Sequence, residues 1–366
     1  MPPLISNKIR QNGGETVLNL KKVLKARELG SFLFFVLLIL LVGFINPAFW
    51  NLSSIINCFN DSVVFTLLSV GIAFVILTGD IDVSIGATLG FSAAVGATLL
   101  RDGSPWMVSV LAAVAIGAVV GLVNGLGVAY LKIPSLIFTL GMNGVVRGLI
   151  YVYTNGAWVE NLPAAFTRAS NAKLVGQLTD FYAVTFLIVG LIAFLIRRTR
   201  VGRYFEAIGD NASGAVLVGI PEKRTRIAAY VICGMFAAAA GMVYSSRIGF
   251  ITPTAGNGYE MKAIAACVIG GIALTGGQGS VVGAAIGAVI MSSISRILVF
   301  LGFSSDYDNT ITGVMLIVIV VVSTVSQNRM IVKNRHEILR ARTVNSRHRD
   351  EKKSGEMPDT KEGRAE

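Results

Sequence analysis

Charge is scarce in this chain of 366 residues, since charged side chains make up 14% of the sequence and hydrophobic ones 53%, with a mean hydropathy of +0.67. Soluble globular domains have about 25% charged residues, so a single water-soluble core is excluded. Histidine is scarcer still, because the only two, His336 and His348, lie in the polar C-terminal segment. The apolar body therefore has no imidazole for acid–base catalysis or for binding a metal.

Two further absences exclude a disulfide framework and one mode of ATP binding. The three cysteines, Cys58, Cys233 and Cys267, stand singly in apolar segments, which is typical of small buried side chains. The pattern GxxxxGK followed by Ser or Thr does not occur, so this chain cannot cradle ATP phosphates in a P-loop. The start also lacks a short apolar stretch with a cleavage site. We therefore expect the first apolar segment to be retained as a membrane helix.

Long apolar segments dominate what is present, and a membrane-spanning helix needs about 20 such residues. Ten segments are candidate spans: 31–50, 55–77, 83–100, 106–131, 135–153, 181–196, 227–246, 263–274, 280–301 and 310–326. The segment 263–274 is short, and the pair on either side of Asp80 and Asp82 could be two spans or one interrupted helix. The predicted fold class is all-α, a polytopic membrane protein with about ten transmembrane helices.

Basic residues indicate how the chain is oriented. Of 32 Lys and Arg, six precede Gly30, seven lie between Arg197 and Arg226, and eleven follow Asn328. Cytoplasmic segments are rich in Lys and Arg, so we expect these three to be cytoplasmic. Segments on the same side of the membrane are separated by an even number of spans, and ten spans satisfy this condition, with six before Arg197 and four after Arg226. The net charge of +11 is thereby assigned to topology, and no nucleic-acid partner is expected.

The charge distribution also predicts how the chain is divided. A basic N-terminal segment, 1–30, precedes a transmembrane domain, 31–327, which contains the basic loop 197–226. The tail 328–366 has almost no large apolar residues, so it cannot bury enough surface to fold alone. Both termini are predicted to be cytoplasmic. The segment 154–180 is the one long loop expected on the outer side, as a cap or as a docking surface for an external partner.

An internal repeat lies within the apolar body. Residues 77–90 read LTGDIDVSIGATLG and residues 274–287 read LTGGQGSVVGAAIG, with six identities in fourteen positions. Each copy places a polar, glycine-rich break between two apolar stretches, on the cytoplasmic side of the ten-helix topology. Such a repeat indicates two related bundles with a substrate path at their junction. Glycine-rich membrane helices can also resemble each other by composition alone.

One cytoplasmic stretch resembles a known family. Residues 202–220, GRYFEAIGDNASGAVLVGI, followed by PEKRTR, resemble the cytoplasmic motif of ATP-binding-cassette (ABC) transporter permeases. Other segments agree in the same order: NPAFWNLSSI near 46, ILTGDIDVSIGA near 76, PSLIFTLGMNGVVRGL near 134, and PTAGNGYEMKAIAACVIGGIALTGGQGSVVGAAIGA from 253. The whole is similar to the ribose-type (monosaccharide) permeases of binding-protein-dependent import systems. The resemblance covers nearly everything from Asn46 to Ser323.

The resemblance implies a transport subunit rather than an enzyme. It implies alternating access that moves a small hydroxylated solute, a monosaccharide first of all, and is driven by a separate cytoplasmic ABC ATPase subunit holding ATP and Mg²⁺. A second permease chain, in a homodimer or heterodimer, and an extracytoplasmic solute-binding protein complete the expected complex in a bacterial inner membrane. The alternative is an ion- or proton-coupled secondary transporter without an ATPase. That alternative needs an acid deep in the membrane, and only Asp61 approaches this requirement.

The ATPase-coupling role is expected on a short helix within the cytoplasmic motif. Asp210 and Asn211 are cap candidates for a mildly apolar helix, 212–218, which Gly219 and Pro221 end. Such a helix can seat in a groove of a partner protein. The residues assigned to coupling are Gly202, Glu206, Ala207, Gly209, Asn211, Ala212, Gly219 and Ile220.

Charged side chains at the centre of a membrane helix cost about 2.5–3.5 kcal/mol each, so those present invite a functional reading. The candidates for the translocation path or for structural polar contacts are Asp61, Asp82, Arg147, Asn257, Tyr259, Glu260 and Arg296. For Asp80 and Asp82, which lie at a break that water can reach, we favour a structural role, as a cap on the helix that follows at Ser84 or in orienting the break, over contact with the substrate. Arg147 is expected to pair with an acid that the sequence does not identify. Arg296 could equally reach the membrane interface from the outer end of its helix.

Overall fold

The structure is a computed structural model that describes residues 27–170, 172–302, 304, 307, 310–318, 321 and 325. By internal contacts the chain as far as Leu316 forms one compact unit, and all elements named below belong to it. Of the second unit, which begins at Ile317, only residues 317, 318, 321 and 325 are described. The predicted tail 328–366 and most of the predicted segment 1–30 lie outside the described residues.

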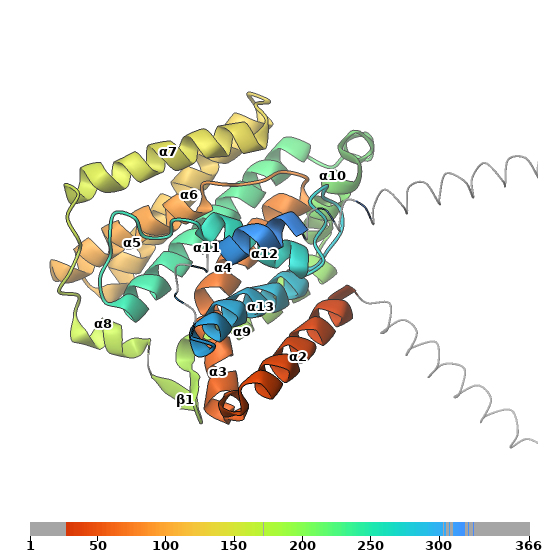
Figure 1. Ribbon diagram of the computed structural model, residues 1–366. Coiled ribbons are helices and arrows are strands. Elements are labelled where there is room, and N and C mark those ends of the chain that lie inside the picture. Colours follow the sequence, from red (N-terminus) through yellow and green to blue (C-terminus); the bar gives the residue numbers. More distant parts are fainter. Residues whose placement is uncertain are drawn as a thin grey trace, which may run out of the picture. The chain divides into compact units, whose positions relative to one another are not determined.

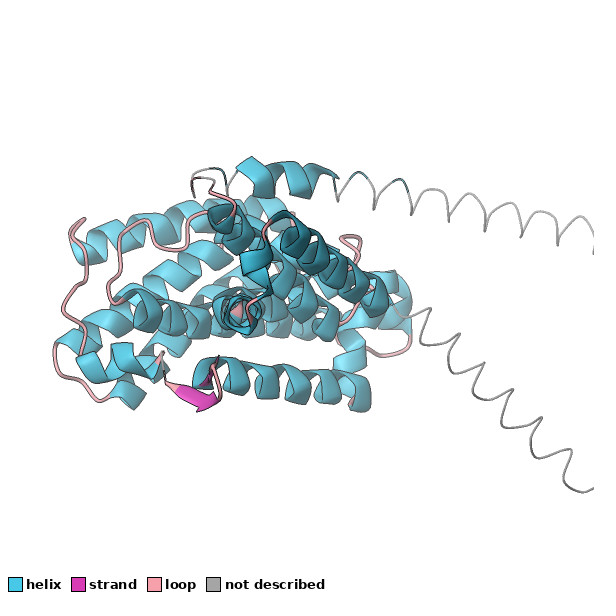
Figure 2. Cartoon of the chain, turned by 60° about the horizontal axis from the view of Figure 1, so that its bottom comes forward, coloured by secondary structure: helices cyan, strands magenta, loops and turns pink. Residues whose placement is uncertain are grey.

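The first unit is built of helices that follow the order of the predicted apolar segments (Figure 1). They are α2 (Arg27–Ile45), the 3-10 turn η1 (Pro47–Trp50), α3 (Leu52–Asp61), α4 (Val63–Leu77), α5 (Ile85–Arg101), α6 (Trp106–Ala129), α7 (Ser135–Thr154), α8 (Ala164–Ala169), α9 (Asp180–Arg198), α10 (Arg200–Leu217), α11 (Glu222–Ile248), α12 (Tyr259–Ile269) and α13 (Val281–Phe300). Two short antiparallel strands, β1 (Lys173–Val175) and β2 (Leu178–Thr179), form the only sheet in the described part of the chain (Figure 2). The predicted all-α class is confirmed.

The number of spans can be compared with the prediction of ten. Among the described residues, five helices are long and apolar enough to cross a membrane: α6, α7, α9, α11 and the part of α13 from 281 to 298. The pair α3 and α4, bent by 42°, makes a sixth if it forms one span, and α2 and α5 contain shorter apolar helices. The predicted span 263–274 corresponds to α12, whose 11 residues reach about 16 Å at 1.5 Å per residue, less than a bilayer core. The count of ten and the repeat stay predictions.

The centre of the unit is occupied by α4 and α11. All residues of α4 except Phe65 are buried, because its sequence is apolar on every face and has no side that favours water. Beside it, α11 contacts α4, α5 and α6. Its contact with α6 is close because glycines face each other: a Cβ on Gly234 would overlap the carbonyl oxygen of Gly117. Small residues that let backbones approach in this way are typical of membrane helix pairs.

The length of α11 separates two ends of the unit that carry polar groups. Its 27 residues, from Glu222 to Ile248, span about 40 Å at 1.5 Å per residue. α10 immediately precedes its start, whereas α8 and the β1–β2 hairpin lie near its end, as α10 and β1 at opposite sides of Figure 1 show. The segment 154–180, predicted as a loop, thus contains a short helix and a hairpin.

Candidate functional site

The two repeated glycine-rich breaks meet at the α10 end of the unit. The amide of Gly277, after α12, donates to the carbonyl oxygen of Leu77 at the end of α4, at 3.0 Å. Gly209 of α10 lies against both: a Cβ there would overlap the Leu77 oxygen and the Gly277 nitrogen. Gly79 and Gly276 have φ of +83° and +84°, which only glycine adopts easily. We call these residues, Leu77, Gly79, Gly209, Gly276 and Gly277, the glycine junction.

α10 consists of two helical segments with a break at Asn211, whose φ of −157° and ψ of 94° are not helical. Of the two predicted cap residues, Asn211 makes the cap bond, since its Oδ1 accepts from the amide of Gly214 at 2.9 Å. The segment after the break ends in three exposed apolar side chains, Val216, Leu217 and Val218, with 50%, 88% and 76% of their surfaces accessible. We call these three residues the α10 tip.

The residues to which coupling was assigned divide between two environments. Those before the break face the bundle: Gly202 is buried, and a Cβ on it would overlap the backbone of Ile196. Glu206 and Arg197 line a cavity of about 240 Å³ beside Ser280. Burial raises the pKa of the Glu206 carboxyl, and the positive charge of Arg197 opposes that shift. Sequence reasoning grouped these residues with the exposed tip because only their order along the chain was known.

The remaining coupling candidates lie at the surface or just below it. Ala207 and Ala212 are half-buried, Asn211 is exposed, and Gly219, with a φ of +82°, is an exposed turn after α10. Ile220 is half-buried, and its amide donates to the carbonyl oxygen of Ala215 at 3.0 Å. These residues therefore support the position of the α10 tip. The sequence predicted the helix 212–218 that contains the tip, but the three tip residues were not among those assigned to coupling, although three successive apolar residues before a glycine in a polar loop were a usable signal.

Asp80 and Asp82, in the break between α4 and α5, are buried, with 6% and 2% of their surfaces accessible. The interpretation that water reaches them was wrong, because neighbouring helices supply their partners instead. Asp82 accepts from the amide and hydroxyl of Ser84 at 2.8 and 2.7 Å, and Asn124 of α6 donates to it at 3.4 Å. Asp80 forms an ion pair with Arg226 in the first turn of α11. Both acids thus tie the break to other helices.

Arg147 and Glu260 lie in the interior near the loop that precedes α12. The Arg147 Nη1 atom donates to the carbonyl oxygen of Ala255 at 2.5 Å, and Glu260 Oε1 accepts from the amide of Gly258 at 3.3 Å. Neither the second nitrogen of Arg147 nor the second oxygen of Glu260 has a hydrogen-bond partner in the described structure. No ion pair between the two is formed. Asn257, also predicted for the path, is exposed on this loop.

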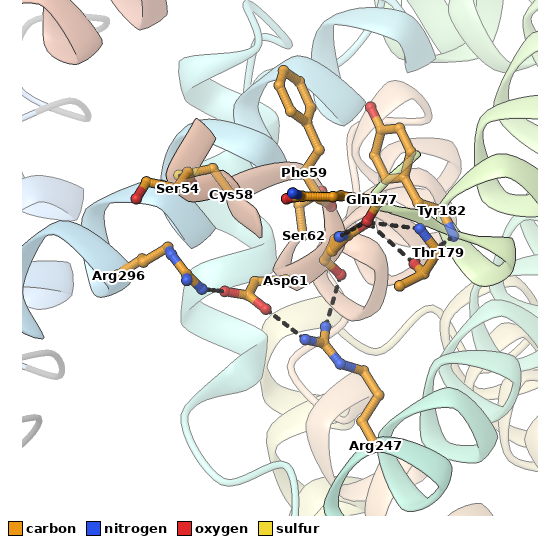
Figure 3. Close-up of polar contacts among 11 residues, drawn as sticks. Ser54, Cys58, Phe59, Asp61, Ser62, Gln177, Thr179, Tyr182, Arg247 and Arg296 are labelled. Carbon is orange, nitrogen blue, oxygen red and sulfur yellow. Dashed lines mark hydrogen bonds and ion pairs between the residues drawn. The ribbon is translucent and has the colours of Figure 1, made fainter. Parts of the chain in front are cut away.

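The other end of the unit contains an ion cluster around Asp61 (Figure 3). One oxygen of Asp61 accepts from Arg247 Nη2 at 2.5 Å, and the other forms an ion pair with Arg296. Arg247 also donates to the carbonyl oxygen of Asn60 at 2.8 Å. Asp61 lies at the bend between α3 and α4, whereas the arginines are near the ends of α11 and α13. We call Asp61, Arg247 and Arg296 the ion cluster.

The ion cluster gives Arg296 an acidic partner and adds a residue that was not predicted. Arg247 was missed because an arginine in the last turn of an apolar helix looks like an ordinary interfacial charge. Asn60, next to Asp61, donates to the carbonyl oxygen of Gln177 at 3.0 Å and accepts from the amide of Thr179 at 3.0 Å. The cluster is therefore connected to the β1–β2 hairpin.

Two cavities share the ion cluster as a wall. The hairpin cavity, of about 670 Å³, is lined by the cluster and by polar residues that include Ser53, Asn57, Lys173 and Gln177. The aromatic cavity, of about 820 Å³, is lined by the cluster and by Phe65, Tyr244, Tyr259, Phe300, Lys262, Ser292 and Ser295. Cavities of about 300–1,000 Å³ are typical of small-molecule sites. Tyr259, a predicted path residue, thus faces the same space as Asp61 and Arg296.

Among the described residues, those of the glycine junction and the ion cluster included, no group of three or more His, Cys, Asp or Glu side chains could hold a metal ion. The three cysteines are buried and unpaired.

Comparisons with known proteins identify the family. A family described as "Branched-chain amino acid transport system / permease component" matches residues 54–320. The Autoinducer 2 import system permease protein LsrC of Enterobacter sp. (strain 638) is 40% identical over 302 residues, covering 82% of this chain and 88% of the relative. The LsrC proteins of Escherichia coli (strain K12 / DH10B) and Salmonella typhi are each 38% identical over 82% of this chain and over 88% and 87% of their own. No solved structure matches.

These matches confirm the predicted resemblance to sugar-type ABC importer permeases and the prediction of a transport subunit rather than an enzyme. They decide against the alternative of a secondary transporter, and the acid that it required, Asp61, is held by two arginines. The family match covers most of the chain, and its relatives are multi-pass permeases of bacterial import systems. The chain therefore belongs to the permease components of the branched-chain amino acid transport family, as the membrane subunit of an ABC importer.

Proposed function

We propose that this chain forms the path by which a small hydroxylated solute enters the cell, by alternating access driven by a cytoplasmic ATPase subunit that carries ATP and Mg²⁺. Its relatives are named for the import of autoinducer 2, which makes autoinducer 2 the first substrate to test and monosaccharides the second. The observation that carries the proposal is the glycine junction, where α10 touches the backbones of both repeated breaks. Contacts between backbones leave no side chain to absorb a displacement, so a push on α10 moves α4 and the loop after α12 together.

The ATPase contact is assigned to the α10 tip. Leu217, the most exposed of its three apolar side chains, projects from a short helix that Asn211 caps and Gly219 ends. An exposed apolar helix of this kind fits a groove on a partner protein. The bundle-facing residues Gly202, Glu206 and Gly209 then transmit the movement rather than bind the ATPase.

Co-purification tests this assignment. With the ATPase subunit co-expressed, the tagged wild-type chain is expected to retain it in detergent, and Leu217→Asp is expected to lose it because a charge then faces the apolar groove. Leu217→Met is the matched control and should retain the ATPase, since it keeps an apolar side chain of similar size. Equal recovery with wild type and Leu217→Asp would remove the α10 tip from the proposal.

A second permease chain, identical or a sibling, is proposed to pack on α7. Gly141, Gly144 and Gly148 share one face of this helix, and a Cβ on any of them would meet no described atom within 4 Å. Exposed Ile137 and Val152 extend that face. Lipid tails make few van der Waals contacts with a row of glycines, whereas a second helix can approach such a row closely and pack against it.

The orientation follows from the charge distribution. With α10 in the cytoplasm, both termini are cytoplasmic and ten spans cross the membrane between them. The chain then consists of the cytoplasmic segment 1–30, the transmembrane domain 31–327 and the cytoplasmic tail 328–366. The ion cluster and the β1–β2 hairpin then face outward, near the solute-binding protein that delivers the substrate. Asp82, Arg147, Asn257 and Glu260 are proposed to shape the interior of the path, whereas Asp61, Tyr259 and Arg296 line its outer part.

A further inference from the structure

Aromatic rings line part of the aromatic cavity. The ring centroid of Tyr259 lies 4.8 Å from that of Phe65 and 5.8 Å from that of Tyr244, so the three rings form one cluster, in which the Tyr244 and Tyr259 rings are close to perpendicular. Aromatic side chains offer a large, rigid apolar contact at little cost in side-chain entropy. The C–H face of a small sugar or polyol has the same apolar character, and such a molecule fits within a cavity of about 820 Å³.

Hydrogen-bonding groups line the same cavity. Arg247 and Arg296 each give one terminal nitrogen to Asp61, and each guanidinium has five N–H donors in one plane. The carboxylate between them is an acceptor, and the hydroxyl groups of Ser292 and Ser295 line the same cavity. Hydroxyl groups both donate and accept hydrogen bonds, so adjacent hydroxyl groups of a solute can bind the arginine donors and the carboxylate acceptor between them. The aromatic rings and the hydrogen-bonding groups together therefore match a molecule with one apolar face and a polar edge.

The charge of the cavity narrows the class of solute further. Three cationic side chains, Arg247, Arg296 and Lys262, line it with a single carboxylate, Asp61. The Lys262 ammonium lies 5.4 Å from the Phe65 ring centroid and 5.9 Å from that of Tyr259, so it makes cation–π contacts with the aromatic rings. The excess of positive charge repels cationic solutes and accepts neutral or anionic ones.

We infer that the aromatic cavity is a binding site for a polyhydroxylated solute without positive charge, whose hydroxyl groups are held by Arg247, Arg296 and Asp61 and whose carbon face stacks on Tyr259. The inference rests on the proposed function, because it names the solute class of the path proposed there. It makes Arg296 and Tyr259 specificity-determining residues.

Saturation-transfer NMR on the full chain in lipid nanodiscs tests the inference with three probes: D-ribose, D-ribose 5-phosphate and D-glucosamine. The wild type is expected to give signals with the first two and at least fivefold less with the cationic D-glucosamine. Arg296→Gln and Tyr259→Leu should each lower the D-ribose signal at least fivefold. Arg168→Gln, which makes the same change outside the cavity, and Trp158→Leu, which removes an aromatic ring outside it, are the controls and should keep the D-ribose signal.

A second variant addresses the fold. If Arg296→Gln does not elute as wild type in gel filtration, Arg296→Lys, which keeps the charge facing Asp61 but loses the planar donors, should still lower the D-ribose signal. No signal with any probe, an equal signal from D-glucosamine, or an unchanged D-ribose signal in both cavity variants would overturn the inference. ATP-driven uptake, measured on the same preparations, separates the two claims. Uptake without the predicted binding pattern refutes only the cavity, whereas the binding pattern without ATP-driven uptake refutes only the proposed function.

Discussion

Replacement of Gly209 by alanine adds a single methyl group to α10 at the glycine junction. The new Cβ would overlap the carbonyl oxygen of Leu77 and the amide nitrogen of Gly277, the two atoms of one hydrogen bond, and would lie 3.0 Å from the carbonyl carbon of Gly276. All three are backbone atoms, so no rotamer change makes room. α10 must therefore move away from the junction, or the junction must open.

The magnitude follows from three terms. Overpacking costs about 1–3 kcal/mol, and loss of the buried backbone hydrogen bond costs about 1–3 kcal/mol more. Replacing a helix-interior glycine with alanine returns about 1 kcal/mol through helix propensity. The net cost is about 3 kcal/mol, which lowers the population of molecules with α10 seated at the glycine junction roughly 100-fold.

The assay is ATP-driven uptake into proteoliposomes that contain the co-purified ATPase. Gly209→Ala should keep the ATPase bound, because the α10 tip is untouched, and should lower uptake roughly 100-fold. Gly190→Ala on α9 is the control, since a Cβ there meets no described atom within 4 Å, and its uptake should stay within about threefold of wild type. Normal uptake by Gly209→Ala would refute transmission through the glycine junction.

Three more predictions concern other parts of the unit. Gly144→Leu on α7 should lower uptake at least tenfold and reduce co-purification of a second permease chain, whereas Gly190→Leu on an equally open face of α9 should change neither; equal effects of the two would contradict the α7 interface. Asp80→Asn should lower the free energy of unfolding by about 1–3 kcal/mol because half-buried Arg226 loses one of its two carboxylate partners and keeps only Glu222, and the double variant Asp80→Asn/Arg226→Gln should recover part of that loss; additive losses would show that the pair is not coupled. Because burial raises the pKa of Glu206, the ionised form is disfavoured in the folded chain; Glu206→Gln should raise the melting temperature at pH 7.5, with a gain that vanishes near pH 4, and a lower melting temperature at pH 7.5 would contradict the burial argument.

Features that arise within one segment of the chain were predictable. A membrane helix must satisfy its own backbone hydrogen bonds, so long apolar runs such as that of α6 could be predicted from sequence. The cap at Asn211 also depends only on residues three apart, and it was one of two residues proposed. The bend after Asp61 was not predicted, because a single charged residue in an apolar run does not by itself indicate a change of direction.

Features that depend on how helices pack were not predictable. Asp61 is 186 residues from Arg247 and 235 from Arg296, and Asp80 is 146 residues from Arg226. Nothing local distinguishes these arginines from other charges near helix ends. The same reason explains the wrong interpretation of Asp80 and Asp82, since Asn124 of α6 and Arg226 of α11 contact them in addition to Ser84, their neighbour in sequence.

The proposed function requires ATP-driven movement of solute through this chain. Proteoliposomes that contain the chain with its ATPase and its second permease chain, with the solute-binding protein on the outer side, ATP on the α10 side and no ion gradient, should accumulate labelled autoinducer 2 on the α10 side in a manner that vanadate stops and a protonophore does not affect. Accumulation that proceeds without the ATPase and collapses when the protonophore is added would contradict the account.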